Sequence, residues 1–211
     1  MRFSTIQTWL VGVLVVAGTL GWQGIAQADE AKGDATRGAK VAYTCLGCHG
    51  IAEYRNSYPN YHVPKIGGQN AEYIVAALGE YHAGARKHPT MRAQASSMTD
   101  QSMLDIAAYL ASDTPLRSKT QPVANVPKTV QNVCAACHGL DGIAALPAYP
   151  NLAGQQADYI EQALRAYKSG ARQNAVMNGM SATIADEEIP LLARYYANQS
   201  PGLWVPKAAH H

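Results

Sequence analysis

Apolar residues recur at helical spacing in several stretches of the chain. In residues 100–111, for example, Leu104, Ala107 and Ala108 lie three or four positions apart or side by side, which predicts an amphipathic helix. Asp100 suits the N-terminus of that helix. No stretch shows the alternation of apolar and polar residues that is typical of β-strands. The pattern therefore predicts an almost wholly α-helical protein.

The predicted elements occur in the same order twice. Each half has a short helix that leads into a pair of cysteines, a loop rich in Gly and Pro, a longer helix, a second loop that carries a methionine, and a final helix. The predicted helices span residues 35–44, 71–83 and 100–111 in the first half, and residues 130–133, 157–169 and 186–197 in the second.

An internal repeat underlies this order. Residues 45–50 (Cys-Leu-Gly-Cys-His-Gly) match residues 134–139 (Cys-Ala-Ala-Cys-His-Gly), and residues 64–74 match residues 150–160. Between these two matches the first half has a longer, Tyr-rich loop at residues 54–62. Two copies of this size predict two small domains that arose by duplication.

The N-terminus has the pattern of a secretory signal peptide. Arg2 is followed by an apolar run over residues 9–20, and Ala-Gln-Ala at residues 26–28 precedes Asp29. The apolar run is shorter than the roughly 20 residues of a membrane span, although an uncleaved anchor is the alternative. Between the repeats, residues 112–126 contain two prolines and lack helical spacing. The predicted organisation is a signal peptide over 1–28, a first domain over 29–116, a linker over 117–126 and a second domain over 127–211.

Charge and aromatic composition narrow the possible partners. The 17 basic and 15 acidic residues give a formal net charge of +2 and are spread without blocks of one sign. This distribution argues against a nucleic-acid partner and against a polybasic membrane patch. Phe3 lies in the predicted signal peptide and is the only phenylalanine, so tyrosine must supply most of the aromatic packing.

Each half contains the sequence Cys-x-x-Cys-His, the attachment signature of c-type haem. Two thiols at this spacing can add to the two haem vinyl groups, and the adjacent histidine can ligate the iron. A zinc site would need four ligands where each half offers three, and a thioredoxin-like cysteine pair would need a βαβ context. We therefore predict two covalently bound haem c groups, with no cysteine left for disulfides. The attachment residues are Cys45, Cys48, Cys134 and Cys137, and the proximal ligands are His49 and His138.

The sixth iron ligand distinguishes an electron carrier from an enzyme. A methionine opposite the histidine is typical of electron-transfer cytochromes and raises the reduction potential. Only Met91 and Met177 hold equivalent positions in the two repeats, so we predict that they are the axial ligands. The other candidates have no methionine or histidine at the equivalent position of the other repeat, and they are interpreted as core or as solvated surface. They are Met98, Met103, Met180, His62, His82 and His88.

The combination of motifs resembles the cytochrome c4 family. Each Cys-x-x-Cys-His is followed by Pro-x-(Leu/Ile)-x-Gly-Gln, a methionine and a final helix with Ala-x-Tyr, and the resemblance covers residues 35–196. It implies two class I cytochrome c domains around a pseudo-twofold axis, with the haem propionate edges facing each other. It also implies that the carbonyls of Pro64 and Pro150 accept hydrogen bonds from the rings of His49 and His138, which would orient both ligands.

These features predict a periplasmic dihaem electron carrier that is not an enzyme. The resemblance implies a redox donor (a cupredoxin, another cytochrome or a quinol-oxidising complex) and a terminal oxidase as acceptor, with any contact to the inner membrane made through these partners. The alternative is a redox enzyme subunit, such as a dihaem thiosulfate-oxidising or peroxidase-type cytochrome, which would need an open iron or an unusual ligand. A haem-based sensor is a third class, but neither half carries a fused signalling segment.

Three weaker signals leave alternatives open. Arg86 and Arg172 follow helix-ending glycines, and either approach a propionate or belong to a helix C-terminus. Gln69 and Gln155 either bond across the domain interface or cap helices. The loop at residues 54–62 either docks a redox partner, covers the first haem or packs on the other domain.

Overall fold

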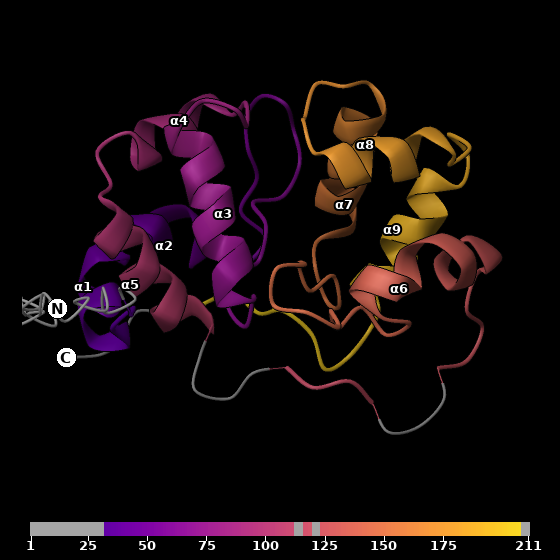
Figure 1. Cartoon of the computed structure of the whole chain (residues 1–211), viewed down its shortest axis with the longest axis horizontal. Helices are drawn as coiled ribbons and strands as arrows, with labels where there is room; N and C mark the ends of the chain where they lie inside the picture. The colour runs from indigo at the N-terminus through magenta and orange to yellow at the C-terminus, as the bar shows by residue number, and fades with distance from the viewer. Residues whose placement is uncertain (1–31, 112–115, 120–122, 208–211) are drawn as a thin grey trace, which may run out of the picture. The chain divides into compact units, whose positions relative to one another are not determined.

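The computed structural model describes residues 32–111, 116–119 and 123–207. The predicted signal peptide and part of the predicted linker lie outside these residues. Two similar groups of helices follow each other along the described chain (Figure 1). The first group comprises α1 Ala35–Val41, α2 Tyr43–His49, α3 Ala71–His82, α4 Pro89–Ala95 and α5 Asp100–Ala111. The second comprises a π-helical turn at Val130–Cys134, α6 Ala135–His138, α7 Ala157–Lys168, α8 Ala175–Ala182 and α9 Ile189–Ala197.

The described part of the chain has no β-strand ladder, only isolated bridges between Arg55 and His62 and between Gly67 and Trp204. None of the described helices is both long enough and apolar enough to span a bilayer. The prediction of an all-α protein with two tandem domains is confirmed.

Each half has its own hydrophobic core. In the first half α3 packs on α5, and Ile74, Leu78 and Ile106 are buried between them. In the second half α7 packs on α9, where Ile160 and Leu192 are buried. Duplicated helices thus bury duplicated apolar faces, which explains why one repeat of about this length can form a core of its own.

Several predicted helix boundaries were wrong. The helix predicted over residues 35–44 is two helices with a break at Ala42. The helix predicted over residues 130–133 is a π-helical turn. The final helix begins at Ile189 rather than at Asp186, because Pro190 lacks an N–H and is tolerated only in a first helical turn. The two methionine-bearing segments are short helices, not loops.

The two halves meet through equivalent glutamines. The Gln69 amide donates to the carbonyl of Asn151 at 3.0 Å and accepts from the Asn151 N–H at 2.8 Å. Gln155 makes the same pair of bonds with the backbone of Lys65, both at 2.8 Å. Each glutamine also accepts from the next N–H, that of Asn70 or Gln156, at the start of α3 or α7. Neither α3 nor α7 has a side-chain cap, so the alternative that the structure supports is the bonding across the interface, which follows the two-fold symmetry of the repeat.

The C-terminal strap, defined here as residues 202–207, holds on to both halves. It is the yellow segment that leaves α9 and runs back towards the first half (Figure 1). Gly67 and Trp204 exchange backbone hydrogen bonds of 3.0 and 3.1 Å, and the Leu203 N–H donates to Ala153 at 2.7 Å. The indole of Trp204 lies so close to Gly68 that a Cβ there would be 2.2 Å from the ring. Gly68 also has a φ of +76°, so glycine is needed for both reasons.

The Tyr-rich loop of the first half packs on α7 of the second. His62 Nδ1 lies 2.8 Å from the Asp158 carboxylate, and the Arg55 guanidinium lies 3.3 Å from it. The ring of Tyr61 packs against that of Tyr159 at 6.1 Å between centroids. These contacts agree with the alternative that the loop packs on the other domain.

Candidate cofactor site

A mostly apolar cavity of about 490 Å³ runs through both halves. Side chains of all the predicted haem-binding residues line it. They are Cys45, Cys48, His49 and Met91 from the first half, and Cys134, Cys137, His138 and Met177 from the second. The fold therefore brings together two equivalent sets of Cys, Cys, His and Met that the sequence separates.

The ring of His49 is oriented by a backbone carbonyl. Its Nδ1 lies 2.8 Å from the carbonyl oxygen of Pro64. A carbonyl can only accept, so Nδ1 carries the proton and Nε2 keeps a free lone pair. Removal from water lowers the pKa of His49, and the neighbouring His88 lowers it further, while the bond to Pro64 opposes this. A neutral imidazole with a free Nε2 is the form that binds iron.

His138 repeats this arrangement in the second half. Its Nδ1 lies 3.0 Å from the carbonyl oxygen of Pro150, and burial lowers its pKa. The hydrogen bonds expected from Pro64 and Pro150 are thus both present in the structure. Pro64 and Pro150 lie in the loops that Gln155 and Gln69 hold in place across the interface.

The four cysteines, all within the described residues, are free thiols rather than disulfides. Positions three apart on a helix share a face, which turns both sulfurs of each pair towards the cavity. Burial raises the pKa of Cys45, and it raises the pKa of Cys134 to about 11. The Cys134 thiol donates to the carbonyl of Thr129 at 3.6 Å. Both thiols thus stay protonated at neutral pH.

Met91 and Met177 occupy the same position in two equivalent short helices. His88 caps α4 by accepting from the N–H of Met91 at 3.3 Å, and Asn174 caps α8 by accepting from that of Met177 at 3.0 Å. Both methionines are half-buried at the cavity wall. Met98 and Met180 also line the cavity, so the equivalence of Met91 and Met177 still carries their assignment. Met103 is buried in the core, as predicted.

Comparisons with known proteins agree with this site. The cytochrome c family model matches residues 35–113 and 123–199. Cytochrome c4 of Pseudomonas aeruginosa is 30% identical over 192 residues, which are 84% of this chain and 92% of that protein. The chain belongs to the cytochrome c4 family. The crystal structure of reduced cytochrome c4 from Pseudomonas stutzeri matches with a TM-score of 0.64 and 28% identity, covering 79% of this chain and 99% of that one.

One similar protein has a different name. A relative from Stutzerimonas stutzeri, the thiosulfate dehydrogenase electron acceptor, is 29% identical over 191 residues, which are 82% of this chain and 88% of that protein. Proteins of the cytochrome c family hold haem c covalently, and both Cys-x-x-Cys-His motifs of this chain fit that attachment.

The interpretation of the other histidines as solvated surface was wrong for two of them. His62 and His88 are half-buried, one bonded to Asp158 and the other capping α4. His82 is exposed and bonds the carbonyl of Ala95 at 2.8 Å. The partner of His62, Asp158, lies in the other half of the molecule, so no local sequence pattern could indicate this contact.

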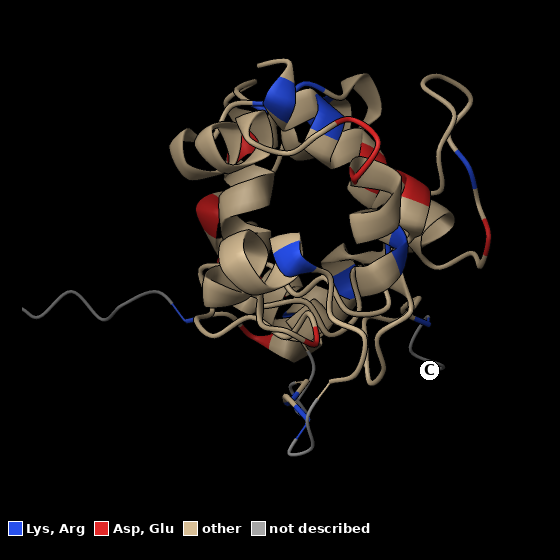
Figure 2. Ribbon diagram, turned by 90° about the vertical axis from the view of Figure 1, so that its right-hand side faces the viewer, with Lys and Arg blue, Asp and Glu red and all other residues tan. Residues whose placement is uncertain are grey.

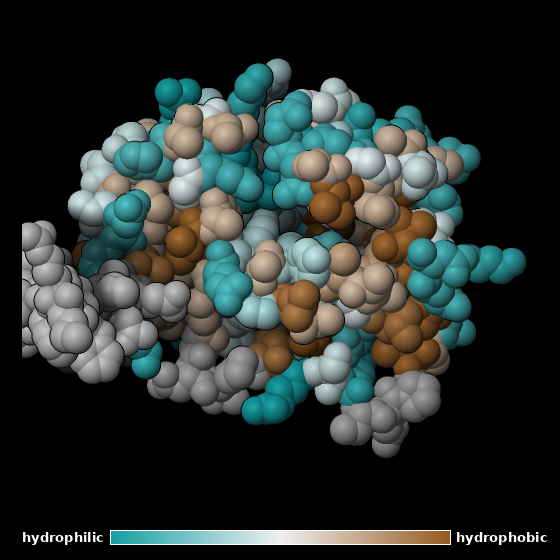
Figure 3. Space-filling model, in the orientation of Figure 1, coloured by the Kyte–Doolittle hydropathy of each residue, from teal (hydrophilic) through white to brown (hydrophobic). Residues whose placement is uncertain are grey.

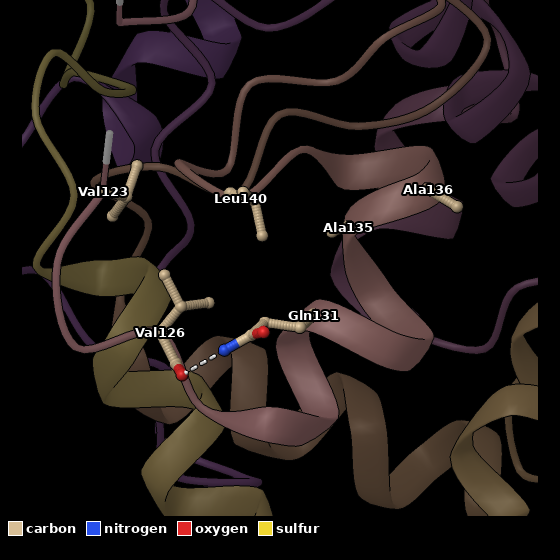
Figure 4. Close-up of a pocket in the computed structure, with 6 residues that line it drawn as sticks. All are labelled: Val123, Val126, Gln131, Ala135, Ala136 and Leu140. Carbon is tan, nitrogen blue, oxygen red and sulfur yellow. Dashed lines mark hydrogen bonds between the residues drawn. The ribbon is translucent and has the colours of Figure 1, made fainter. Parts of the chain in front are cut away.

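Apolar side chains surround both attachment motifs on the outside of this c4-type fold. A shallow pocket of about 630 Å³ lies against α6. Its lining includes Ala135 and Ala136, which stand between the two cysteines, and Val126, whose carbonyl accepts from Gln131 at 2.9 Å (Figure 4). In the first half Tyr43 and Ile51 are exposed beside the motif. On the face drawn in Figure 3, hydrophobic residues gather over the half that contains α6.

Charged residues are distributed over the described helices without a region of one sign. Figure 2 shows Lys and Arg interspersed with Asp and Glu around the ring of helices. Long-range electrostatic steering of a partner is therefore expected to be weak.

Proposed function

We propose that the chain is a periplasmic dihaem electron carrier and not an enzyme. The observation that carries this proposal is the single cavity lined by two complete Cys, Cys, His and Met sets. Cys45 and Cys48 would hold one haem, with His49 and Met91 as axial ligands. Cys134, Cys137, His138 and Met177 would do the same for the second. Each haem would supply a one-electron Fe(III)/Fe(II) couple, and ligation by both histidine and methionine would leave the iron without an open position for a substrate.

The chain's own residues prepare the site for electron transfer. Burial keeps each imidazole neutral, and the carbonyls of Pro64 and Pro150 set its tautomer and orientation. The capped helices α4 and α8 hold the methionines at fixed positions. The mostly apolar cavity would keep water away from the bound haem groups. A rigid, dry site of this kind needs little rearrangement when the charge on the iron changes.

The proposed partners are a redox donor, such as a cupredoxin, another cytochrome or a quinol-oxidising complex, and a terminal oxidase as acceptor. Weak steering and the apolar surroundings of both motifs favour short-lived contacts at the haem edges. A second candidate donor is a thiosulfate-oxidising enzyme, because the similar protein from Stutzerimonas stutzeri is named as the electron acceptor of one.

Haem counting tests the proposal. The exported protein should carry two haems that resist acid-acetone extraction and show a methionine–iron absorption band in the far red. The double variant Cys45→Ala/Cys48→Ala should keep only the second haem, and the matched Cys134→Ala/Cys137→Ala only the first. Two extraction-resistant haems in either variant, or rapid peroxide turnover by the wild type, would overturn it.

A further inference from the structure

Two arginines and two tyrosines form crossed pairs between the halves. The Arg86 guanidinium donates to the Tyr159 hydroxyl at 2.7 Å, and the Arg172 guanidinium donates to the Tyr73 hydroxyl at 3.2 Å. The arginines are equivalent in the repeat, and so are the tyrosines. Each arginine therefore bonds to a tyrosine of the other half, and the two pairs are related by the same symmetry as the glutamines.

Each guanidinium also stacks on an aromatic ring of its own half. Arg86 lies 4.5 Å from the ring centre of Tyr81, and Arg172 lies 4.4 Å from that of Tyr167. Arg86 is 7% exposed and Arg172 is 9% exposed. The sequence left open whether these arginines serve a helix terminus or a carboxylate, and the side chains in fact turn into the cavity.

The cluster has two buried positive charges and no negative charge to balance them. Among the described residues, neither Arg86 nor Arg172 forms a salt bridge with an Asp or a Glu. Nε of Arg172 is buried without a hydrogen-bond partner. Burial resists ionisation of Tyr73, yet the two guanidiniums outweigh it and lower the pKa of Tyr73 to about 8. A buried guanidinium remains charged, so this arrangement needs an anionic partner.

The cavity indicates what that partner is. All four side chains line the cavity that contains the haem-binding residues. A guanidinium matches a carboxylate through two parallel N–H donors, and a tyrosine hydroxyl can supply a third. Each haem of the proposed carrier brings two carboxylates into this otherwise apolar space.

We propose that Arg86 with Tyr159, and Arg172 with Tyr73, form two carboxylate sites, each assembled from both halves and each receiving a propionate of the haem in the arginine's own half. This inference rests on the proposed function. Its consequence is that the reduction potential of each haem depends on a tyrosine of the opposite half. A nearby positive charge and donated hydrogen bonds favour Fe(II) over Fe(III), so losing either lowers the potential.

The test uses the full-length protein with both haems attached. Tyr159→Phe should lower one of the two potentials, Tyr73→Phe the other, and the double variant both. The expected change is several-fold to tenfold in each Fe(III)/Fe(II) equilibrium constant, where tenfold corresponds to about 59 mV for one electron. Redox-difference infrared spectra should show shifted propionate carboxylate bands. Tyr109→Phe is the matched control, because its hydroxyl bonds the Lys207 carbonyl at 3.0 Å and it does not line the cavity.

Variants with a single haem show to which haem each shift of the reduction potential belongs. With Cys134→Ala/Cys137→Ala, Tyr159→Phe should still lower the potential of the first haem, although Tyr159 belongs to the half without one. If that protein does not fold, Arg86→Lys in the two-haem protein replaces it and should shift the same potential as Tyr159→Phe. Unchanged potentials in both tyrosine variants, or a shift of the same haem by both, would overturn the crossed sites. A haem count other than two would instead overturn the proposed function.

Discussion

The two halves of the chain begin differently, although each leads into the same Cys-x-x-Cys-His motif. In the first half α1 is tied to α5 by an ion pair, in which Asp105 accepts from Arg37 Nε and Nη2, both at 2.8 Å. In the second half a π-helical turn takes that place, and Thr129 donates to Glu188 at 2.8 Å. The approach to the motif can therefore vary, provided the cysteines and the histidine reach the cavity.

The contacts that the two halves share are equally informative. Both halves keep the carbonyl that orients the histidine, the side chain that caps the methionine helix, and the glutamine that crosses the interface. These contacts hold ligands or join the halves, whereas the differing contacts only stabilise one half. The comparison indicates that the duplicated halves diverged where only stability was involved.

The strongest test of equivalence is removal of the axial methionines. Met91→Ala and Met177→Ala should each open one iron to small ligands, abolish about half of the far-red band, and lower one potential by at least about 59 mV, or tenfold in the equilibrium constant. Visible spectra and redox titration measure both effects. Met98→Ala and Met180→Ala are controls that line the same cavity; a loss of the band in either control would mean that the repeat alignment is wrong.

The strap should make the first half more sensitive to substitution at its glycine loop than the second. Gly68→Ala forces a Cβ into the Trp204 indole and strains a positive φ, so we expect a loss of about 2 kcal/mol in the free energy of unfolding. Gly154→Ala has a similar φ of +70°, and its Cβ would meet the strap backbone at Gly202 and Leu203 at 3.1 Å, a milder approach than the 2.2 Å to the indole.

A double-mutant cycle separates the two contributions to the cost of Gly68→Ala. In a Trp204→Ala background the clash is gone, so the cost of Gly68→Ala should fall to about 1 kcal/mol, while that of Gly154→Ala stays the same. Urea denaturation measures each value. An unchanged cost of Gly68→Ala in that background would show that the indole does not restrict this loop.

The ion pair at the start of the first half should give that half an acid sensitivity of its own. Hydrogen bonds from Arg37 lower the pKa of Asp105 to about 2, below its ordinary value of 3.8, and bonds from Asp34 and Gln101 assist. A lowered carboxyl pKa stabilises the fold above about pH 4, and this stabilisation is lost as the pH falls towards 2.

Arg37→Ala should therefore lower the unfolding midpoint at pH 6 and make it depend less on pH between 4 and 2. Thermal unfolding at several pH values measures this. Arg165→Ala, which removes an exposed ion pair to Glu161 in the second half, is the control with little expected change. The same acid dependence in wild type and Arg37→Ala would exclude this pair as its source.

The smallest effect is expected at the Tyr-rich loop. Asp158→Asn weakens the contacts of the α7 carboxylate with His62 and Arg55, which are partly exposed, so the loss should be at most about 1 kcal/mol. Equilibrium denaturation detects it. A larger loss would mean that this loop is a main support of the interface, and that the halves are less alike in stability than their cores suggest.

The sequence was sufficient for the fold and for choosing residues that the structure brings to one cavity, because both depend on a repeated pattern. The duplicated motif identified Cys45, Cys134 and their partners, and repeat equivalence selected Met91 and Met177. It was not sufficient for features that depend on contacts between distant residues. The bonds of His62 and the crossed arginines both required knowledge of which surfaces meet.

Local chemistry explains the errors in helix boundaries. Asn174 and His88 begin helices through side-chain bonds to the methionine N–H groups, so segments that lack strong apolar spacing are nevertheless helical. Pro190 delayed the start of α9. Apolar periodicity detects burial, whereas caps and prolines decide where a helix begins.

The C-terminal strap also imposes an order on assembly. Trp204 covers the glycines that follow Pro64, the residue that orients His49, yet it follows α9 in the sequence and is made after the helices of both halves. The first half can form its own core from residues 35–111, but its glycine loop stays uncovered until the second half is complete. The first half is therefore completed only after the second half has been made. A chain truncated before residue 204 would leave the loop that supports His49 open to water.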